Sequence, residues 1–336
     1  MLGKRNQITK EMTVRKATLA EIHTLWLNYG HIWRWQNPFV TPPWLKSWWN
    51  TFSGKNEPLL IVISADNEPL GFAPLMSRNG TARFMGSIDL CDTGDFIVAP
   101  GKEDLFFSTL LGFLASEGIH RLILEPVRPD SLVCLDMVNV ASHSDWNVYL
   151  VAHGTSLQME LPSTWEEYLQ NLDRKQRHEV RRKLRRLGEA GVLKQYSLRK
   201  LSEVKQIMDL FLQLFRQSRS DKDTFMTESR EVYFRTLADE LASAGMLNML
   251  LLTLDDEPAA AVFCVENRNT VYLYNNGYNP RFRGISMGVI SKLITIRSSI
   301  ESGQQRYDFL NGTERYKYHL GGKEVPLSTC TMEKEN

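Results

Sequence analysis

The chain has 336 residues, of which 43% are hydrophobic and 24% charged, and its formal net charge is +1. These are globular values, and the length suits two domains of ordinary size. A mean hydropathy of -0.30 and apolar runs far shorter than the roughly 20 residues that cross a bilayer argue against a membrane protein, and the small net charge excludes a whole-molecule attraction to nucleic acid.

The N-terminal segment, residues 1–11, has no apolar stretch of the kind found in signal peptides. The four cysteines are far apart and form no CxxC pair, which argues against both a disulfide framework and a zinc cluster. We therefore expect a cytoplasmic protein that uses no metal.

Six of the eight tryptophans lie between residues 26 and 49. We expect these residues mainly to pack helices onto a sheet, although tryptophans near a cleft could also stack on sugar or base faces. An acidic loop follows, with Asp89, Asp92 and Asp95. Solvated charges in a turn are its simplest interpretation.

The second half opens with an apolar strand at residues 157–161, and Thr164 with Glu167 then predicts a capped helix start. Residues 174–187 predict a strongly basic helix with only a narrow apolar stripe. Its candidate ligand-binding residues are Arg177, Arg181 and Arg182, which could bind phosphates of a cofactor, a nucleotide-linked substrate, RNA or anionic lipid. A solvated helix paired to nearby acids is the alternative. Two ordinary core helices follow, near residues 203–219 and 229–244.

The two halves repeat one plan. Residues 61–76 and 250–265 each read as two apolar strands around an Asp-x-Glu-Pro turn, and each hairpin is followed by a helix that ends in glycine and a short strand that begins with arginine. Gly118 thereby aligns with Gly303, and Arg121 with Arg306. A hairpin, helix and strand repeated in one order indicate a duplicated α/β unit, so we predict two domains with mixed sheets, residues 1–153 and 154–336. On the same alignment Asp308 corresponds to Ile123, which makes the second domain the better candidate for an active site and the first a degenerate copy.

The segment that follows the aromatic strand 271–274 predicts a binding site. A glycine in a turn allows close approach of a ligand, and the N–H groups at the start of the following helix favour an anion such as a diphosphate. The candidate residues of this site are Arg281, Arg283, Gly284, Ile285, Ser286, Met287 and Gly288. Two other interpretations are a loop glycine with Ser286 as a helix cap, and a nucleophile elbow with Asp308 and His319. The nucleophile elbow is disfavoured, because too few residues separate Ser286, Asp308 and His319 for the strands and helices that normally lie between such residues.

The candidate catalytic residues lie downstream of this segment. Asp308 stands inside an apolar strand, where burial would raise its pKa and let it accept a proton from an attacking amine or hydroxyl. Tyr316, Tyr274 or Lys317 could donate to the leaving group or stabilise an oxyanion. Each has a structural alternative: Asp308 could pair with Arg306 or Arg315, and the others could serve packing.

The turn at residues 281–286 resembles the acyl-CoA diphosphate turn of the GNAT acetyltransferase superfamily, with Ser286 in place of the last small residue. The wider pattern adds the basic helix, the Tyr272-x-Tyr274-x-x-Gly277 strand, the Tyr307-Asp308-Phe309-x-x-Gly312 strand and Tyr316-Lys317. It is similar to tandem GNAT proteins associated with cellulose or exopolysaccharide biosynthesis, which are related to the Fem-type aminoacyltransferases.

This resemblance implies a tandem duplicated GNAT fold and direct acyl transfer from acetyl-CoA or another acyl-CoA, without a metal. The expected acceptor is a hydroxyl or amine of a carbohydrate or cell-envelope precursor bound between the domains. Transfer from aminoacyl-tRNA is the first alternative, although no long coiled-coil insertion is present. A non-catalytic module that binds a saccharide or partner through the basic helix is the second.

Overall fold

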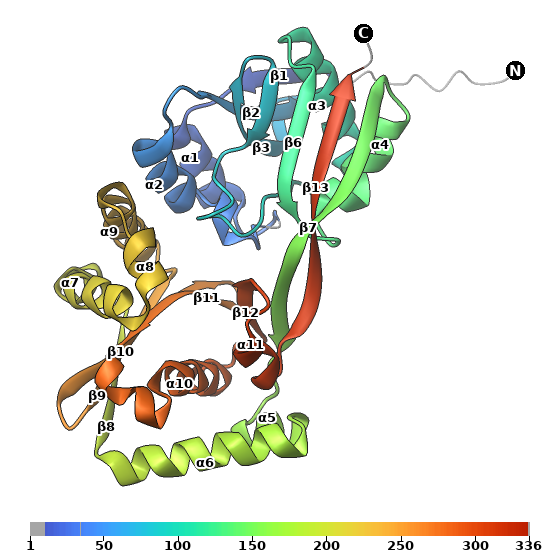
Figure 1. Ribbon diagram of the computed structural model, residues 1–336. Coiled ribbons are helices and arrows are strands. Elements are labelled where there is room, and N and C mark those ends of the chain that lie inside the picture. Colours follow the sequence, from blue (N-terminus) through green and yellow to red (C-terminus); the bar gives the residue numbers. More distant parts are fainter. Residues whose placement is uncertain (1–10, 34, 335–336) are drawn as a thin grey trace, which may run out of the picture. The chain divides into compact units, whose positions relative to one another are not determined.

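The computed structural model describes residues 11–33 and 35–334, so most of the N-terminal segment considered above lies outside the described residues. The chain forms two compact units (Figure 1). Unit 1 comprises the residues up to His153 together with those from Leu327 onward, and unit 2 comprises Gly154–Pro326. The segment after Leu327, which the sequence analysis placed in the second domain, therefore lies in unit 1.

Unit 1 is a mixed sheet with helices. Its strands lie in the order β1-β2-β3-β4-β6-β13-β7, and β5 pairs with β3. The elements are β1 (Met12–Lys16), α1 (Leu19–Tyr29), η1 (Pro38–Val40), α2 (Pro42–Phe52), β2 (Glu57–Ala65), β3 (Glu68–Arg78), β4 (Thr81–Phe84), β5 (Ile97–Val98), α3 (Glu103–Ser116), β6 (Arg121–Val127), η2 (Val133–Met137), α4 (Val138–Ser142), the first half of β7 (Trp146–Glu160) and the end of β13 (Lys323–Lys334).

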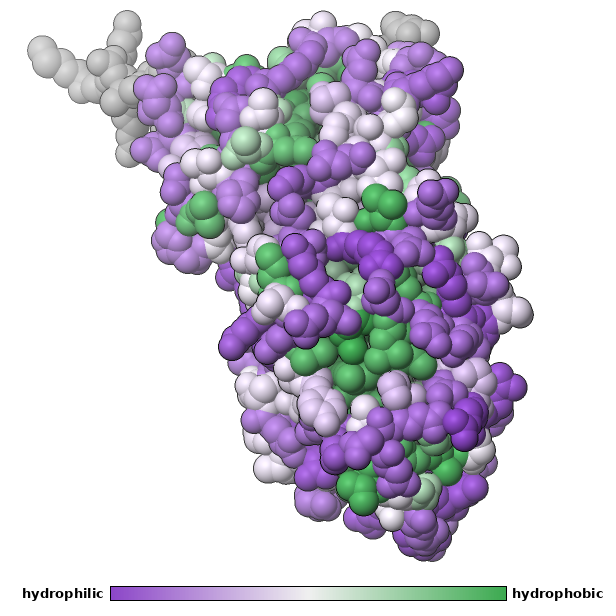
Figure 2. Space-filling view, turned by 90° about the vertical axis from the view of Figure 1, so that its left-hand side faces the viewer, coloured by the Kyte–Doolittle hydropathy of each residue, from purple (hydrophilic) through white to green (hydrophobic). Residues whose placement is uncertain are grey.

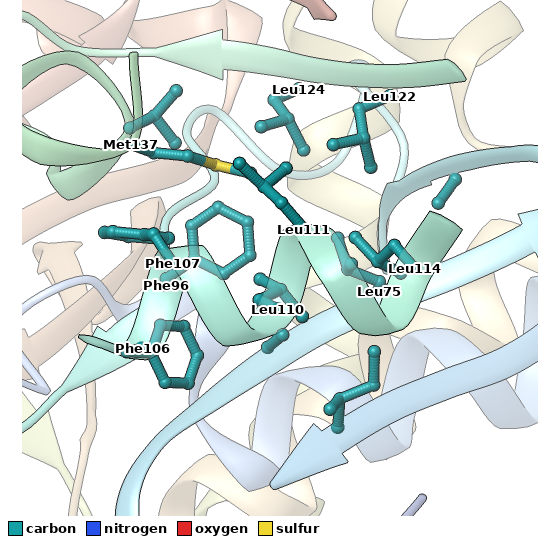
Figure 3. Close-up of a cluster of buried hydrophobic side chains, with 14 of the residues drawn as sticks. Leu75, Phe96, Phe106, Phe107, Leu110, Leu111, Leu114, Leu122, Leu124 and Met137 are labelled. Carbon is teal, nitrogen blue, oxygen red and sulfur yellow. The ribbon is translucent and has the colours of Figure 1, made fainter. Parts of the chain in front are cut away.

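The core of unit 1 lies between α3 and one face of the sheet, as Figure 3 shows for the side chains of α3, β3 and β6. Four of the six tryptophans between residues 26 and 49 are buried, namely Trp33, Trp35, Trp44 and Trp48, which confirms the packing interpretation for them. In the acidic loop, Asp95 accepts hydrogen bonds from the N–H groups of Phe96 (2.9 Å) and Leu132 (3.1 Å). This acid therefore holds a loop in place instead of facing solvent alone.

Unit 2 repeats the arrangement with strand order β7-β12-β11-β10-β9-β8. Its further elements are α5 (Trp165–Asn171), α6 (Arg174–Ala190), β8 (Leu193–Leu198), α7 (Leu201–Ser218), α8 (Ser220–Phe225), α9 (Glu228–Ser243), β9 (Leu247–Leu254), β10 (Glu257–Asn267), β11 (Thr270–Tyr278), η3 (Pro280–Ile285), α10 (Met287–Glu301), β12 (Arg306–Asn311) and α11 (Arg315–His319). Helices α5, α6 and α10 pack on one face of this sheet. Helices α7 and α9 pack on the other, where Phe211 and Phe234 contact Phe263.

The internal duplication is visible in backbone detail. Asp66 and Asn67 turn the β2–β3 hairpin with positive φ angles of 50° and 66°, and Asp255 and Asp256 turn the β9–β10 hairpin with 49° and 63°. Two successive positive φ angles are typical of the type I′ turn, whose twist matches the strands that it joins. The helix-ending glycines also agree, with φ of 77° at Gly118 and 76° at Gly303. The predicted duplication is therefore present in the structure.

Hydrophilic residues cover most of the face shown in Figure 2, with hydrophobic areas between them. Among the described residues, no helix combines the length and apolar character needed to cross a membrane. All four cysteines are free thiols.

Candidate active site

Strands β11 and β12 of unit 2 run side by side only briefly and then separate. Their parallel pairing joins three residue pairs, Thr270 with Arg306, Val271 with Tyr307 and Tyr272 with Asp308, although β11 continues to Tyr278. Beyond the last pair, the facing edges carry backbone groups that the two strands do not satisfy for each other. An extended ligand can bind such an edge as an additional strand.

The segment that follows β11 is a short 3-10 helix, η3, where the sequence suggested a simple turn. The side chain of Asn279 accepts a hydrogen bond from the Arg281 N–H (3.1 Å), which fixes its start. At its end Ser286 adopts a left-handed conformation, with φ of 66°, and its side chain makes no capping hydrogen bond. The sequence pattern predicts this helix over residues 284–303, but α10 begins at Met287, because the chain changes direction at Ser286.

Two backbone amides at the start of α10 are open. The Ser286 N–H donates to the Arg283 carbonyl oxygen (2.9 Å), whereas the N–H groups of Met287 and Gly288 have no acceptor in the described part of the chain. First-turn N–H groups point out of the helix and lie at the positive end of its dipole, which favours anions. Of the backbone amides expected from the sequence to bind an anion, only those of Met287 and Gly288 are therefore available for this role.

Three arginines lie in or beside this segment, and they differ in whether their guanidinium groups already have partners. Arg281 is bound to Glu257 (2.6 Å), while Arg283 is exposed and has no acidic partner among the described residues. Arg186 of the basic helix α6 donates to the Gly284 carbonyl oxygen (3.3 Å). Arg283 is therefore the group of this segment that is available to an anion, and the basic helix contributes Arg186 next to it.

The basic-helix residues predicted from sequence lie elsewhere on α6. Arg177 donates to the carbonyl oxygens of Gln170 and Leu172, and Arg182 binds Glu179 (2.7 Å) on its own helix. Arg181 is exposed and lies 3.9 Å from Glu166. Since α6 rises about 1.5 Å per residue, Arg177 is about 14 Å along the axis from Arg186. The structure thus places Arg177 well away from Arg186, and it places Arg181 and Arg182 beside the acids Glu166 and Glu179.

Asp308 is buried, with 3% of its surface exposed. Its side chain stabilises a bulge in its own strand, β12. Its Oδ1 accepts hydrogen bonds from the Leu310 N–H (2.8 Å) and the Ser156 hydroxyl (3.4 Å). Leu310 has a left-handed φ of 62° at the point where the β7–β12 register shifts. Of the two arginines considered as its partner from sequence, Arg306 binds Glu160 (2.8 Å) and Arg315 donates to His319 (3.3 Å). Asp308 therefore stands at a bulge, in register with Tyr272.

Lys317 is also buried, and its amine is fully engaged. Its Nζ donates to three carbonyl oxygens, of Leu310 (3.1 Å), Asn311 (2.5 Å) and Gly312 (3.1 Å), and it lies 2.9 Å from Glu314. An ammonium group has three donors, and here each has an acceptor. Lys317 thus fixes the end of β12 beside the bulge of Asp308.

Sequence reasoning missed Lys292, which is 5% exposed inside the apolar helix α10. Its Nζ donates to the Gly288 carbonyl oxygen (2.6 Å) and lies 4.6 Å from the centre of the Tyr316 ring. Loss of hydration, assisted by the charge of Lys222, lowers the pKa of Lys292 to about 7. The available signal was a single lysine among the apolar residues 287–296, a position where a charge is costly.

Further charges gather around Lys292. Lys222 of α8 donates to the Asn276 carbonyl oxygen of β11, and loss of hydration lowers its pKa to about 8. Glu314, Lys317 and Arg219 also act on the titration of Lys292. Lysines from α8 and α10, which pack on opposite faces of the sheet, are thus electrostatic neighbours where β11 and β12 part.

The two candidate tyrosines have different surroundings. Tyr316 packs beneath Lys292, and burial raises its pKa well above the usual value. Tyr274 stacks on Phe234 with ring centres 5.5 Å apart and meets Phe263 edge-on. Tyr316 is therefore part of the charged group at α10, while Tyr274 belongs to the aromatic packing under α9.

Comparison with known proteins agrees with this geometry. The model of one protein family, described as the acetyltransferase (GNAT) domain, matches residues 174–318. That stretch therefore resembles a GNAT domain. This match agrees with the expected GNAT-type acyltransferase. No curated protein is detectably similar in sequence.

Several solved structures share the fold. FemX is 12% identical with a TM-score of 0.61, over 94% of this chain and 96% of that one. A tandem GNAT protein from the clavulanic acid biosynthesis pathway is 10% identical with a TM-score of 0.50, over 96% and 98%. The C-terminal DUF2156 domain of a putative lysylphosphatidylglycerol synthetase from Agrobacterium fabrum is 12% identical with a TM-score of 0.52, over 78% and 80%. Such identities show the fold alone, and the predicted tandem GNAT fold is confirmed.

Proposed function

We propose that unit 2 transfers an acyl group from a coenzyme A thioester to an amine or hydroxyl group, and that unit 1 is a degenerate copy that has lost this chemistry. The observation that carries the proposal is the place where β11 and β12 part directly before the open amides of Met287 and Gly288. The pantetheine arm would lie along the edge of β11 beyond its pairing with β12, where Lys222 already binds the Asn276 carbonyl oxygen, and the diphosphate would bind the two amides and Arg283. The GNAT family match over this stretch supports the assignment.

The reaction needs one proton acceptor. The acceptor's nitrogen or oxygen attacks the thioester carbonyl carbon, the C–S bond breaks, and the proton of the nucleophile passes to a base while the thiolate leaves and is protonated to the thiol. Two groups of unit 2 suit this role, the carboxylate of Asp308 and the amine of Lys292, whose lowered pKa of about 7 makes it partly neutral near neutral pH. Tyr316 beside Lys292 is the proposed donor to the leaving thiolate.

The remaining sequence-predicted residues fit supporting roles in this proposal. Lys317 would hold the end of β12 and thereby the bulge at Asp308, since its amine donates to carbonyl oxygens there. Tyr274 would shape the strand edge through its packing on Phe234. We propose a carbohydrate or cell-envelope precursor as the acceptor and acetyl-CoA as the donor, on the strength of the sequence resemblance described first.

Aminoacyl transfer from charged tRNA is a second candidate, favoured by one specific observation. The basic helix α6 leaves Arg181 60% exposed and Arg185 72% exposed, and an exposed row of guanidinium groups suits phosphates of a nucleic acid. The fold similarity to FemX is compatible with it. A non-catalytic saccharide-binding module is the third candidate, and it requires neither Asp308 nor Lys292.

Hydrogen exchange measured by mass spectrometry tests the first candidate. Saturating acetyl-CoA should slow exchange in peptides that cover residues 272–278 and 286–290, because the ligand would cover those amides. Peptides of α9 serve as the internal control and should be unchanged. Unchanged exchange in the two site peptides would remove the support for a thioester at this place.

A further inference from the structure

Unit 1 has its own hollow surface on the sheet face opposite α3. Two cavities of about 240 and 380 Å³ lie there and share a wall formed by Met76, Arg83 and Ile123. Each is near the lower end of the range of small-molecule sites. The first is lined mostly by apolar residues, among them Phe39, Val40, Phe84 and Ile88. The second is polar and includes Arg78 and Arg121.

The strand register explains why three arginines share this face. Met76 of β3 is paired with Arg83 of β4, which is paired with Ile123 of β6. Side chains of directly paired residues point to the same side of a sheet. The next row, two residues along each strand, is Arg78, Thr81 and Arg121. The face therefore carries Arg78, Arg83 and Arg121 in adjacent rows, and we call these three residues the arginine row.

The arginine row holds more positive charge than its protein partners neutralise. Arg83 binds Glu125 (3.0 Å) and Arg121 binds Glu333 (3.2 Å), while Arg78 has no acidic partner in the described part of the chain. The side chains of Arg83 and Arg121 are 45% and 47% exposed. Exposed pairs of this kind contribute little free energy. A ligand anion could therefore bind here at small cost to the protein.

The neighbouring apolar cavity has an unusually hydrophobic rim. Ile88 lines it with 53% of its surface exposed to solvent, in the loop after β4. Its wall is closely packed, because a Cβ atom on Gly94 would lie 2.2 Å from the ring of Phe84. Backbone and ring thus meet without a side chain between them. The cavity offers apolar contacts next to a cationic surface.

We propose that unit 1 binds an amphiphilic organic anion at this place, with a carboxylate or phosphate against the arginine row and a hydrocarbon chain in the apolar cavity at Ile88. Arg83 belongs to the wall shared by the two cavities, so one molecule could place its charged end in the polar cavity and its hydrocarbon end in the apolar cavity. This function is separate from acyl transfer, which we placed in unit 2. Its loss would leave the thioester site intact.

The test is isothermal titration calorimetry of the full chain with two probes, octyl phosphate and octanoate, below their micelle concentrations. Inorganic phosphate and octanol provide the head and the tail alone, and both should bind more weakly than the joined molecules. A preference between octyl phosphate and octanoate identifies the head group. Equal affinity for octyl phosphate and octanol would overturn the proposal, because the arginine row would then contribute nothing.

Two exposed positions separate the parts of the site. Arg78→Gln should weaken octyl phosphate about tenfold through loss of a charge-assisted contact, and it should weaken inorganic phosphate as well. Ile88→Ser should weaken octyl phosphate about fivefold through loss of apolar contact and leave inorganic phosphate unchanged. The matched controls are Arg15→Gln and Leu27→Ser, two exposed residues near α1. Site variants that behave like these controls would also overturn the proposal.

Discussion

The ammonium nitrogen of Lys292 lies 4.6 Å from the centre of the Tyr316 ring, inside unit 2 and without a carboxylate bound to it among the described residues. The partner that would ordinarily neutralise a buried lysine, Glu314, binds Lys317 instead (2.9 Å). A buried amine of this kind destabilises the fold in its charged form. Lys292 lies in the second turn of α10, and its amine binds the Gly288 carbonyl oxygen close to the unpaired amides of Met287 and Gly288. This position favours a catalytic role for Lys292 over a role in packing.

The first prediction concerns stability. Between pH 7 and 10.5 the unfolded chain binds a proton at Lys292 that the folded chain does not, because the folded pKa is lowered to about 7. The free energy of unfolding should therefore rise with pH across this window. Lys292→Met removes the group, so the rise should be smaller in this variant, with Lys222 contributing the remainder, and the variant should be more stable than the wild type at pH 6.

Urea unfolding at pH 6, 7.5 and 9 measures this difference. Lys205→Met is the matched control, because Lys205 is an exposed lysine that faces Asp239. The control should follow the wild-type pH dependence. Identical pH dependence in Lys292→Met and the wild type would contradict a lowered pKa at Lys292.

The second prediction separates the two candidate bases. Asp308→Asn keeps an oxygen that can accept the Leu310 N–H, so the bulge should survive. If Asp308 is the base, the rate of thiol release from acetyl-CoA with hydroxylamine as acceptor should fall about 100-fold or more. If Lys292 is the base, Lys292→Met should produce that loss, and the wild-type rate should rise with pH through about 7. Full activity in both variants would leave neither residue as the base.

The third prediction concerns the donor. Arg283 and Arg281 lie two residues apart, and Arg281 already binds Glu257. Arg283→Gln should weaken coenzyme A binding about tenfold, since a charge-assisted contact to phosphate is lost. Arg281→Gln is the control and should change affinity less. Equal effects of the two substitutions would show that Arg283 makes no specific contact.

The fourth prediction tests the tRNA alternative. Under that alternative, the double change Arg181→Glu and Arg185→Glu should weaken tRNA binding strongly and flatten its dependence on salt, because phosphate contacts release counterions. Filter binding at several salt concentrations measures both quantities. The acyl-CoA proposal expects no change in coenzyme A affinity in the same variant. Weak, unaltered tRNA binding would remove the alternative.

Local features of the fold followed from the sequence because they depend on neighbouring residues. Thr164 and Glu167 form the capping box that their spacing indicated. The paired hairpins, with Asp66 and Asp255 at their turns, revealed the duplication. In register, Asp308 pairs with Tyr272 and Ile123 pairs with Arg83 at equivalent ends of the two parallel strand pairs, as the alignment of the halves implied.

Features that depend on distant contacts could not be predicted in this way. Nothing near Leu327 signals that the last strand lies in unit 1. The three carbonyl acceptors of Lys317 belong to the consecutive residues Leu310, Asn311 and Gly312, but they meet its amine only through the particular path of the chain from β12 to α11. The late start of α10 depends on the left-handed conformation of Ser286, which a non-glycine residue seldom adopts. The conformations of Ser286 and of the segment from β12 to α11 determine which groups of the site already have hydrogen-bond partners.

Isothermal titration of the full chain with acetyl-CoA tests the central claim most directly. The account predicts saturable binding with a Kd below about 1 mM, weakened by Arg283→Gln and not by Arg78→Gln, which lies in unit 1. The absence of binding at millimolar acetyl-CoA, or binding that Arg283→Gln leaves unchanged, would contradict a thioester site at the start of α10.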